Sequence, residues 1–147
     1  MKVAAGSDHA GLAAKTKAIE VLEKLGCEVE DLGTHSESSC DYPDFALKVA
    51  ERVAGGKADL GLLCCGTGIG MSMAANKVPG IRAAVCHNDF TAEMARRHND
   101  ANILCIGGRV LDDRAIEAVV RRFFQTSFDG GRHLRRVKKI ARLDRLR

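Results

Sequence analysis

Two adjacent cysteines, Cys64 and Cys65, stand directly before the glycine-rich segment GTGIG. Because Gly66, Gly68 and Gly70 have no side chains, the backbone N–H groups of this segment can approach a negatively charged oxygen closely. A helix is predicted to begin near the last of these glycines, and the positive end of its dipole would also favour an anion. The segment is therefore predicted to be an anion-binding loop, although a glycine-rich turn can also serve close packing alone.

The cysteine pair would add acid–base or nucleophilic chemistry to this loop. Side chains alternate between the two faces of a strand, so Cys64 and Cys65 should point to opposite sides, one into the core and one into the crevice. Cys65 is closer to the loop and is the candidate for chemistry. A helix N-terminus favours the thiolate of a nearby cysteine, and a thiolate can act as a base or a nucleophile. Two buried structural cysteines are the alternative.

Three familiar motifs do not match this segment. Lys77 is misplaced for a Walker loop, and the glycines do not have the spacing of the dinucleotide fingerprint GxGxxG. A cysteine phosphatase has five residues between its nucleophile and an arginine, and at that spacing this chain has Gly70 after Cys64 and Met71 after Cys65. A protease-like pair of Cys65 with His98 is conceivable, but nothing in the sequence shows that the two side chains meet.

Polar residues also follow other predicted strands or end predicted helices. Asp8 and His9 lie just after the first strand, and Arg109 ends the segment GGR after the last one. His98 and Asn99 lie near the end of a predicted helix, where Asn commonly forms turns. Each of these residues has two possible interpretations: a structural role as a cap, turn or surface side chain, or a role in a functional site.

The C-terminal segment is strongly basic. The chain has 23 Lys or Arg and 19 Asp or Glu, and eight of the basic residues lie between Arg132 and Arg147. Arg132, His133 and Arg136 can share one face of a helix, which suits a phosphate dianion, and a solvated basic tail is the alternative. Nucleic-acid binding is not expected, because the tail lacks interleaved aromatic residues and the rest of the chain is acidic overall.

Short apolar segments alternate with longer amphipathic ones along the chain. The predicted strands are KVAAG, CEVEDLG, ADLGLLCCG, IRAAVC and NILCIGG. Helices are predicted over 12–25 and 45–56, from about 70, over about 90–97 and 114–124, and from about 132–134 as a basic C-terminal helix. Either Asp112 or Asp113 is expected to cap the helix that begins at 114.

This order predicts a Rossmann-like α/β fold of three layers, with helices on both faces of a five-stranded parallel sheet. Residues 1–147 are expected to form a single domain, because the chain is long enough for one core and shows no repeat or linker. Ligands of such sheets bind beyond the carboxyl ends of the strands. The polar residues that follow the strands are therefore expected to converge on one edge.

The composition is that of a soluble protein, with 46% hydrophobic and 29% charged residues and no apolar run long enough to span a membrane. The N-terminal sequence MKVAAGSDHAG lacks the apolar core of a secretory signal, so a cytoplasmic location is expected. The six cysteines form no CxxC pair and show no metal-ligand spacing with the five histidines. They are predicted to be reduced, and a structural zinc site is not expected.

Seven segments spread over almost the whole chain resemble the ribose-5-phosphate isomerase B family, which also includes allose-6-phosphate and galactose-6-phosphate isomerases. They are GSDHAG, DYPDFA, CGTGIGMSMAANK, GIRAAVC, RHNDANIL, GGR and GGRHLRRV. The resemblance implies interconversion of an aldose phosphate and a ketose phosphate through an enediolate, without a metal or another cofactor. Ribose 5-phosphate and ribulose 5-phosphate are the expected pair.

The same resemblance implies roles for individual residues. Cys65 would move the proton between C1 and C2, while Thr67 and the backbone amides of Gly66, Gly68 and Gly70 would stabilise the oxyanion. His98 would assist the opening of the furanose ring. The remaining residues would position the sugar (Asp8 and Tyr42), hydrogen-bond its reacting oxygens (Asn99), or bind its phosphate (His9, Arg132, Arg136 and, nearby, Arg109).

One branch of the family lacks the cysteine and has a glutamate where this chain has Met71. Methionine cannot take a proton, so the chain resembles the cysteine-base branch. Family members are homodimers whose sites combine both subunits, and the resemblance implies that His98 and Asn99 come from the partner. Whether dimers pair into tetramers is left open by the sequence.

The substrate is the least determined point, because the resemblance gives no expectation for the segment HSESSC at 35–40, close to the expected sugar. The same chemistry on allose 6-phosphate, galactose 6-phosphate or a tetrose phosphate is the main alternative. A non-catalytic sugar-phosphate- or nucleotide-binding module is the rival from another class. It predicts normal ligand binding after Cys65→Ala and no turnover even by the unmutated protein.

Overall fold

Five parallel strands form the central sheet of the computed structural model, which describes residues 1–146. The strands are β1 (Lys2–Ser7), β2 (Glu28–Asp31), β3 (Leu60–Cys65), β4 (Ala83–Val85) and β5 (Ile103–Gly107). They lie in the order β2-β1-β3-β5-β4, and every neighbouring pair is parallel. The predicted five-stranded parallel sheet is confirmed, and β3 lies at its centre.

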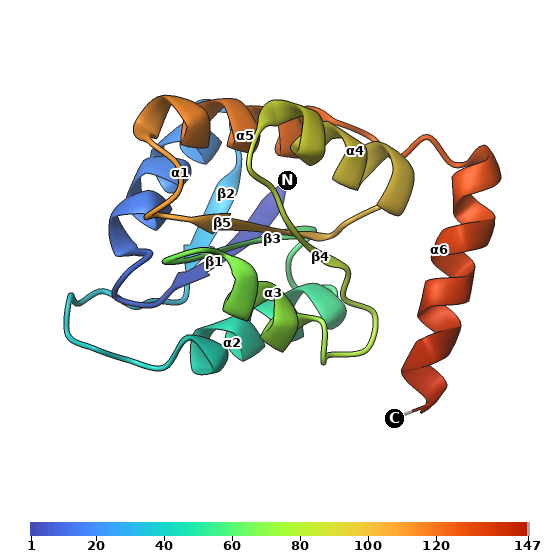
Figure 1. Ribbon diagram of the computed structural model, residues 1–147, viewed down its shortest axis with the longest axis horizontal. Helices are drawn as coiled ribbons and strands as arrows, with labels where there is room; N and C mark the ends of the chain where they lie inside the picture. The colour runs from blue at the N-terminus through green and yellow to red at the C-terminus, as the bar shows by residue number, and fades with distance from the viewer. Residues whose placement is uncertain (147) are drawn as a thin grey trace.

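Helices cover both faces of this sheet, as Figure 1 shows. The helices are α1 (Leu12–Lys24), α2 (Tyr42–Ala54), α3 (Ile69–Ala75), α4 (Asp89–Asn99), α5 (Asp113–Gln125) and α6 (Gly131–Leu143), followed by a short 3-10 turn, η1 (Asp144–Leu146). α1, α4 and α5 pack on one face, while α2 and α3 pack on the other. The three-layer α/β fold predicted from the sequence is therefore present.

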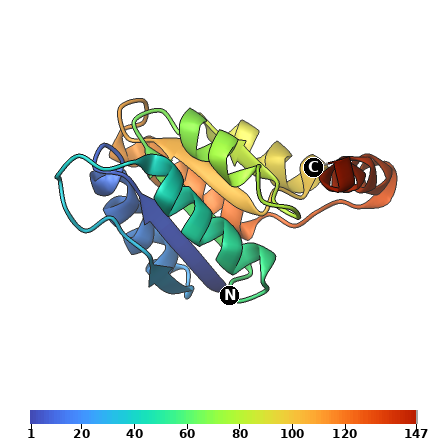
Figure 2. The same ribbon diagram turned by 90° about the horizontal axis from the view of Figure 1, so that it is seen from below.

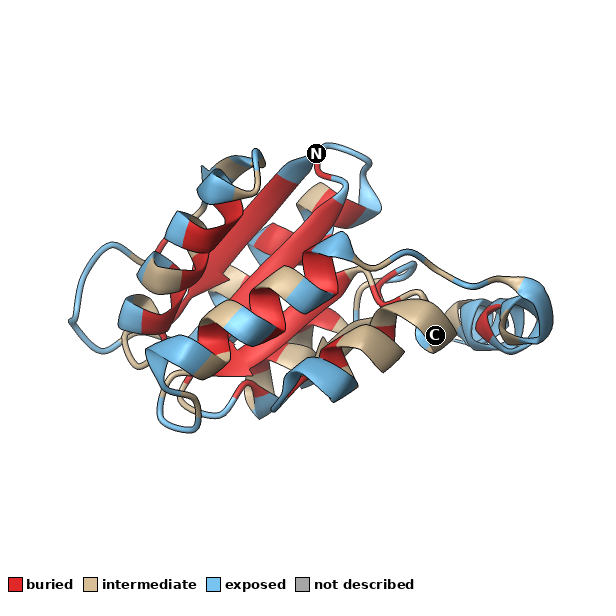
Figure 3. Cartoon of the chain, turned by 90° about the horizontal axis from the view of Figure 1, so that it is seen from above, coloured by how far each residue is buried: buried red, intermediate tan, exposed pale blue. Residues whose placement is uncertain are grey.

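The core lies on both sides of β1, β3 and β5, which are buried along almost their whole length (Figure 3). Successive side chains of β3 alternate between the two layers. Leu62 and Cys64 face α1 and α5, whereas Leu63 and Cys65 face α2 and α3. The predicted opposite orientation of the two cysteines is confirmed.

Local signals set the helix boundaries, and the structure differs from the sequence prediction at the start of α2, the end of α4 and the start of α6. Asp112 caps α5 by accepting a hydrogen bond from the backbone N–H of Ala115 at 2.8 Å. α2 begins at Tyr42 rather than at 45, with a proline in its first turn. α4 continues through Asn99 rather than ending at 97. α6 begins at Gly131.

The last helix stands apart from the rest of the fold, on the side where α4 ends (Figures 1 and 2). α6 packs against α4 and buries Val137, while Leu134, Ile140 and Leu143 are exposed. No helix within residues 1–146 is long and apolar enough to cross a membrane.

Candidate active site

The carboxyl ends of β1, β3 and β5 are joined by backbone hydrogen bonds into one edge. The N–H of Asp8 donates to the carbonyl of Cys64 at 3.3 Å, and the N–H of Arg109 donates to the carbonyl of Gly66 at 3.0 Å. Each of these residues lies within two positions of the end of a strand, so the order of the strands decides that they meet. The sequence prediction that polar residues gather at this edge is correct for Asp8, Cys65 and Arg109.

The loop after β3 is wrapped around the sulfur of Cys65. The backbone N–H of Gly68 donates a hydrogen bond to Cys65 Sγ at 3.0 Å in a buried environment. Gly68 has a φ of +80°, a conformation that side chains other than glycine rarely adopt, and α3 begins at the next residue. The hydroxyl oxygen of Thr67 accepts the N–H of Ile69 at 3.3 Å. Thr67 and Gly68 are thereby held beside the sulfur.

The neighbouring Cys64 lies in a different environment. It is fully buried among apolar side chains, and burial raises its pKa far above the ordinary range of a thiol. Burial also raises the pKa of Cys86, to about 11. All six cysteines lie in the described part of the chain and are free. Cys64 is thus a protonated packing residue, while Cys65 is the cysteine that reaches the loop.

Two glycines of the loop allow other side chains to approach. A Cβ atom at Gly66 would lie 3.3 Å from Nη1 of Arg109, and one at Gly70 would lie 2.7 Å from the ring of Tyr42. The second distance is shorter than real Cβ contacts, so a side chain at position 70 would displace the ring of Tyr42. Tyr42 and Arg109 therefore lie against the loop that holds Cys65.

The two residues after β1 are both fixed by hydrogen bonds. The buried carboxylate of Asp8 accepts the N–H of Gly11 at 2.9 Å, immediately before α1. Nδ1 of His9 accepts the backbone N–H of Cys40 at 3.2 Å. Asp8 is not the N-cap of α1, which is Gly11, but its carboxylate stabilises the turn before the helix at the same edge as Cys65.

His98 and Asn99 lie at the opposite end of the sheet. α4 runs back along the sheet, and only three residues, 100–102, separate it from the beginning of β5. Cys65, by contrast, pairs with Gly107 at the end of β5. A strand advances about 3.3 Å per residue, so roughly 13 Å of β5 separates the two ends. Within one chain, the sequence-predicted residues therefore form two groups rather than one.

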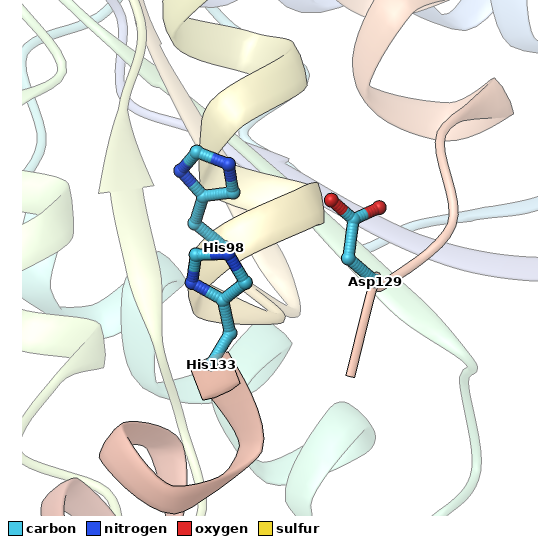
Figure 4. Close-up of side chains that lie close together, drawn as sticks. All are labelled: His98, Asp129 and His133. Atoms are coloured by element: carbon cyan, nitrogen blue, oxygen red, sulfur yellow. The ribbon is translucent and has the colours of Figure 1, made fainter. Parts of the chain in front are cut away.

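The second group gathers where α4 meets α6 (Figure 4). The rings of His98 and His133 stack with their centroids 4.2 Å apart and an angle of 7° between their planes. Nε of Arg97 donates to a carboxylate oxygen of Asp129 at 3.1 Å. The basic segment of α6 supplies the other members of this group, Arg132 and Arg136.

Electrostatics in this second group favour an anion. Burial, together with the nearby His98, Arg132 and Arg136, lowers the pKa of His133. The hydrogen bond from Arg97 lowers the pKa of the Asp129 carboxyl. Ring nitrogens of the two histidines and a carboxylate oxygen of Asp129 lie within 4.8 Å of one another, so the three residues could hold a metal ion. However, the arginine on Asp129 and the surrounding positive charge oppose a cation.

Sequence reasoning missed some members of this group. His133 was noted only as part of a basic face, and nothing in the sequence indicated Asp129 or its pairing with Arg97. The one available signal was the placement of His133 between Arg132 and Arg136. The stacking partner of His133 is 35 positions away, and only the packing of α6 on α4 brings the rings together.

A sequence model described as Ribose/Galactose Isomerase matches residues 3–140. The chain belongs to the ribose/galactose isomerase family. It is 43% identical to ribose-5-phosphate isomerase B of Escherichia coli, over 99% of this chain and 98% of the relative. It is also 46% identical to a putative sugar phosphate isomerase of Bacillus subtilis, over 96% of this chain and 95% of that protein.

Solved structures of the family have the same fold. Ribose-5-phosphate isomerase B of Clostridium thermocellum superposes with a TM-score of 0.97 at 51% identity, covering 99% of both chains. The protein of that name from Mycoplasma genitalium, solved with bound ribulose 5-phosphate, superposes with a TM-score of 0.93 at 42% identity, covering 98% of this chain and 96% of the other. The family resemblance inferred from the seven segments is confirmed.

Proposed function

We propose that this protein is an aldose–ketose isomerase that interconverts ribose 5-phosphate and ribulose 5-phosphate. The observation that carries the proposal is nearly full-length similarity to ribose-5-phosphate isomerases B, one of which has ribulose 5-phosphate bound. The glycine loop and basic groups of the chain suit an anionic sugar phosphate. Because phosphorylated sugars do not cross membranes freely, a cytoplasmic location belongs to the proposal.

Cys65 is the proposed base. In the ring-opened aldose, its thiolate takes the proton from C2, and the electron pair forms an enediolate across C1 and C2. The proton then returns to C1, and transfer of a proton from O2 to O1 completes the ketose with no net gain or loss of atoms. The N–H that Gly68 directs at Sγ stabilises negative charge on sulfur. This route needs no metal or other cofactor.

The surrounding loop would stabilise the intermediate. Thr67 and the N–H groups between Gly66 and Gly70 lie beside Cys65 and would donate to the developing oxyanion. Asp8 and Tyr42, at the same edge, would position the sugar hydroxyls. His9 and Arg109 stand at the mouth of this edge, where the phosphate would enter the site.

A second copy of the chain would complete the site. Asn99 would bind the reacting oxygens, and His98 would open the furanose ring by moving a proton from O1 to the ring oxygen. Arg132 and Arg136 would bind the phosphate. The position of α4 and α6 at the end of the sheet away from Cys65 supports this proposal, because the four residues lie far from the loop of their own chain. We infer a homodimer with two shared sites, and the whole chain as one isomerase domain.

A six-carbon substrate is the second candidate, because the matching family also covers galactose isomerases. The segment 35–40 is largely exposed and leads directly to Tyr42, so it borders the space that a longer sugar would occupy. Allose 6-phosphate, galactose 6-phosphate and a four-carbon sugar phosphate therefore belong in the same assay.

The test is an assay of purified protein with ribose 5-phosphate in the presence of EDTA, following formation of ribulose 5-phosphate. We expect turnover by the wild type and its loss in Cys65→Ala, with phosphate-ester binding retained by the variant. If the protein turned over only another sugar phosphate, that compound would replace ribose 5-phosphate as the proposed substrate. Ligand binding without turnover of any of these sugar phosphates would contradict the proposed activity in favour of a binding module.

A further inference from the structure

A backbone amide far along the chain determines where His9 carries its hydrogen. The N–H of Cys40 donates to Nδ1 of His9 at 3.2 Å. A backbone N–H can only donate, so Nδ1 must be the unprotonated nitrogen of the ring. A neutral imidazole with a bare Nδ1 has its hydrogen on Nε2. The thiol sulfur of Cys40 lies 3.9 Å from the same Nδ1, which makes the amide the closer partner.

The segment that presents this amide is anchored at its beginning by a buried charge. Lys15, on α1, is fully buried, and its Nζ donates to Oδ1 of Asp31 at 2.6 Å and to the carbonyl of Thr34 at 2.7 Å. The N–H of Gly33 donates to the same Asp31 oxygen at 2.9 Å. A buried ammonium group needs such partners, so Lys15 fixes the backbone between 31 and 34.

The same backbone is tied to the end of β1, two residues before His9. The N–H of Ser7 donates to the carbonyl of Gly33 at 2.7 Å, and the N–H of Thr34 donates to the carbonyl of Ser7 at 2.8 Å. Ser7 is two residues before His9. The intervening residues 36–39 are exposed and are held by local turns. The segment therefore begins next to Ser7, two residues before His9, and its other end brings the Cys40 amide to the ring of His9.

We propose that the segment 35–41 is a positioning element that makes His9 a hydrogen-bond donor toward the substrate phosphate. This inference rests on the proposed function, in which His9 binds that phosphate. A phosphate dianion only accepts hydrogen bonds, so a ring with hydrogen on Nε2 attracts it, whereas a bare Nε2 would face it with a lone pair. Cys40, through its amide, and Lys15, through the anchor, are positioning residues.

The direct test compares Cys40→Pro, which removes the amide hydrogen, with Cys40→Ala, which keeps it. Nitrogen-15 shifts of the imidazole report the tautomer, and His9→Gln assigns the His9 signals. We expect Nε2–H for His9 in the wild type and in Cys40→Ala, and a loss of that preference in Cys40→Pro. Loss of one hydrogen bond to a charged group should raise KM for ribose 5-phosphate, and the Kd for inorganic phosphate, about tenfold. The change in kcat should be smaller.

Two results would overturn the proposal: Nδ1–H on His9 in the wild type, or an unchanged tautomer and an unchanged KM in Cys40→Pro. Lys15→Met should shift the tautomer and KM in the same direction, whereas Lys24→Met, at the exposed end of the same helix, should not. If Lys15→Met fails to fold, the Cys40 pair still decides the question. A wild type with the expected tautomer and phosphate affinity but without turnover would contradict only the proposed function.

Discussion

The loop after β3 and the junction of α4 with α6 hold their polar side chains by different means. The loop continues a fully buried strand, and Gly68 ties its backbone to the sulfur of Cys65 at 3.0 Å. The junction instead relies on the stacking of His98 on His133 and on surface ion pairs such as Arg97 with Asp129. One group is therefore set by the core of the fold, and the other by a helix that stands apart from it.

This difference corresponds to two requirements: the loop must hold a reacting group in a precise position, whereas the junction must reach another copy of the chain. A proton-transferring group must be held within tenths of an ångström, which a strand buried on both faces provides. Groups that bind a phosphate tolerate more adjustment, and a helix outside the core can carry them to another copy of the chain. We expect mutations of the loop to change the chemical step, and mutations of the junction to change binding and assembly.

The largest expected effect is a difference in kcat between alanine variants of the two adjacent cysteines. Cys65→Ala should lower kcat by roughly 100- to 10,000-fold, the usual effect of losing a general base. Cys64→Ala should leave kcat near the wild-type value and reduce the free energy of unfolding by about 1 kcal/mol, because it removes a buried sulfur. Steady-state kinetics and urea unfolding measure the two effects. Equal losses of kcat in both variants would contradict the assignment.

Alkylation examines the same pair without mutation. Iodoacetamide should inactivate the enzyme by modifying Cys65, and ribose 5-phosphate should protect it. Burial keeps Cys64 protonated, so mass spectrometry should find it unmodified. Full activity with Cys65 stoichiometrically alkylated would exclude its thiolate as the base.

A smaller effect should come from the backbone of the loop. Gly68→Ala places a side chain at a φ of +80°, with backbone atoms of Ile106 3.0 to 3.2 Å from the new Cβ. The strain costs about 1–2 kcal/mol and displaces the N–H that donates to Cys65. We expect kcat to fall roughly tenfold with KM changed less. Gly56→Ala, also at positive φ but with no atom near its Cβ, controls for backbone strain alone.

The smallest effect concerns the pH dependence of the junction. The pKa of His133 is lowered in the folded protein, mainly by burial, so the unfolded chain binds its proton more readily. Its contribution to stability is therefore complete above the ordinary value of 6.5 and weakens as the pH falls below it. Asp129 is the only group that raises this pKa among those acting on it. Asp129→Asn should lower the pKa further, which proton NMR of the His133 ring measures. An upward shift would contradict this electrostatic account.

Much of the loop could be predicted from the sequence, because its determinants are local. The opposite orientation of the Cys64 and Cys65 side chains follows from strand geometry, and the glycines predict the turn before α3. The ends of α2 and α4 were misplaced, because capping and packing extend both helices beyond their apolar patterns. Tyr42 therefore lies within α2, and His98 within α4.

Contacts between segments that are distant in the sequence could not be predicted from local patterns. The amide of Cys40 meets His9 across 31 positions, and Lys15 meets Asp31 across 16. Neither pair has a motif, since any residue except proline supplies an amide and most lysines are exposed. Only the order of β2 and β1 in the sheet, together with the return of the chain to α2, brings these residues together.

We propose that each site combines the loop of one chain with the α4–α6 junction of another. A complementation experiment tests this proposal by mixing two variants that should each be inactive, Cys65→Ala and His98→Asn, after unfolding and joint refolding. If the sites are shared, random pairing yields mixed dimers with one intact site, and activity should return to about one quarter of the wild-type value. No recovery, in a mixture shown by native mass spectrometry to contain mixed dimers, would mean that each chain builds its site alone.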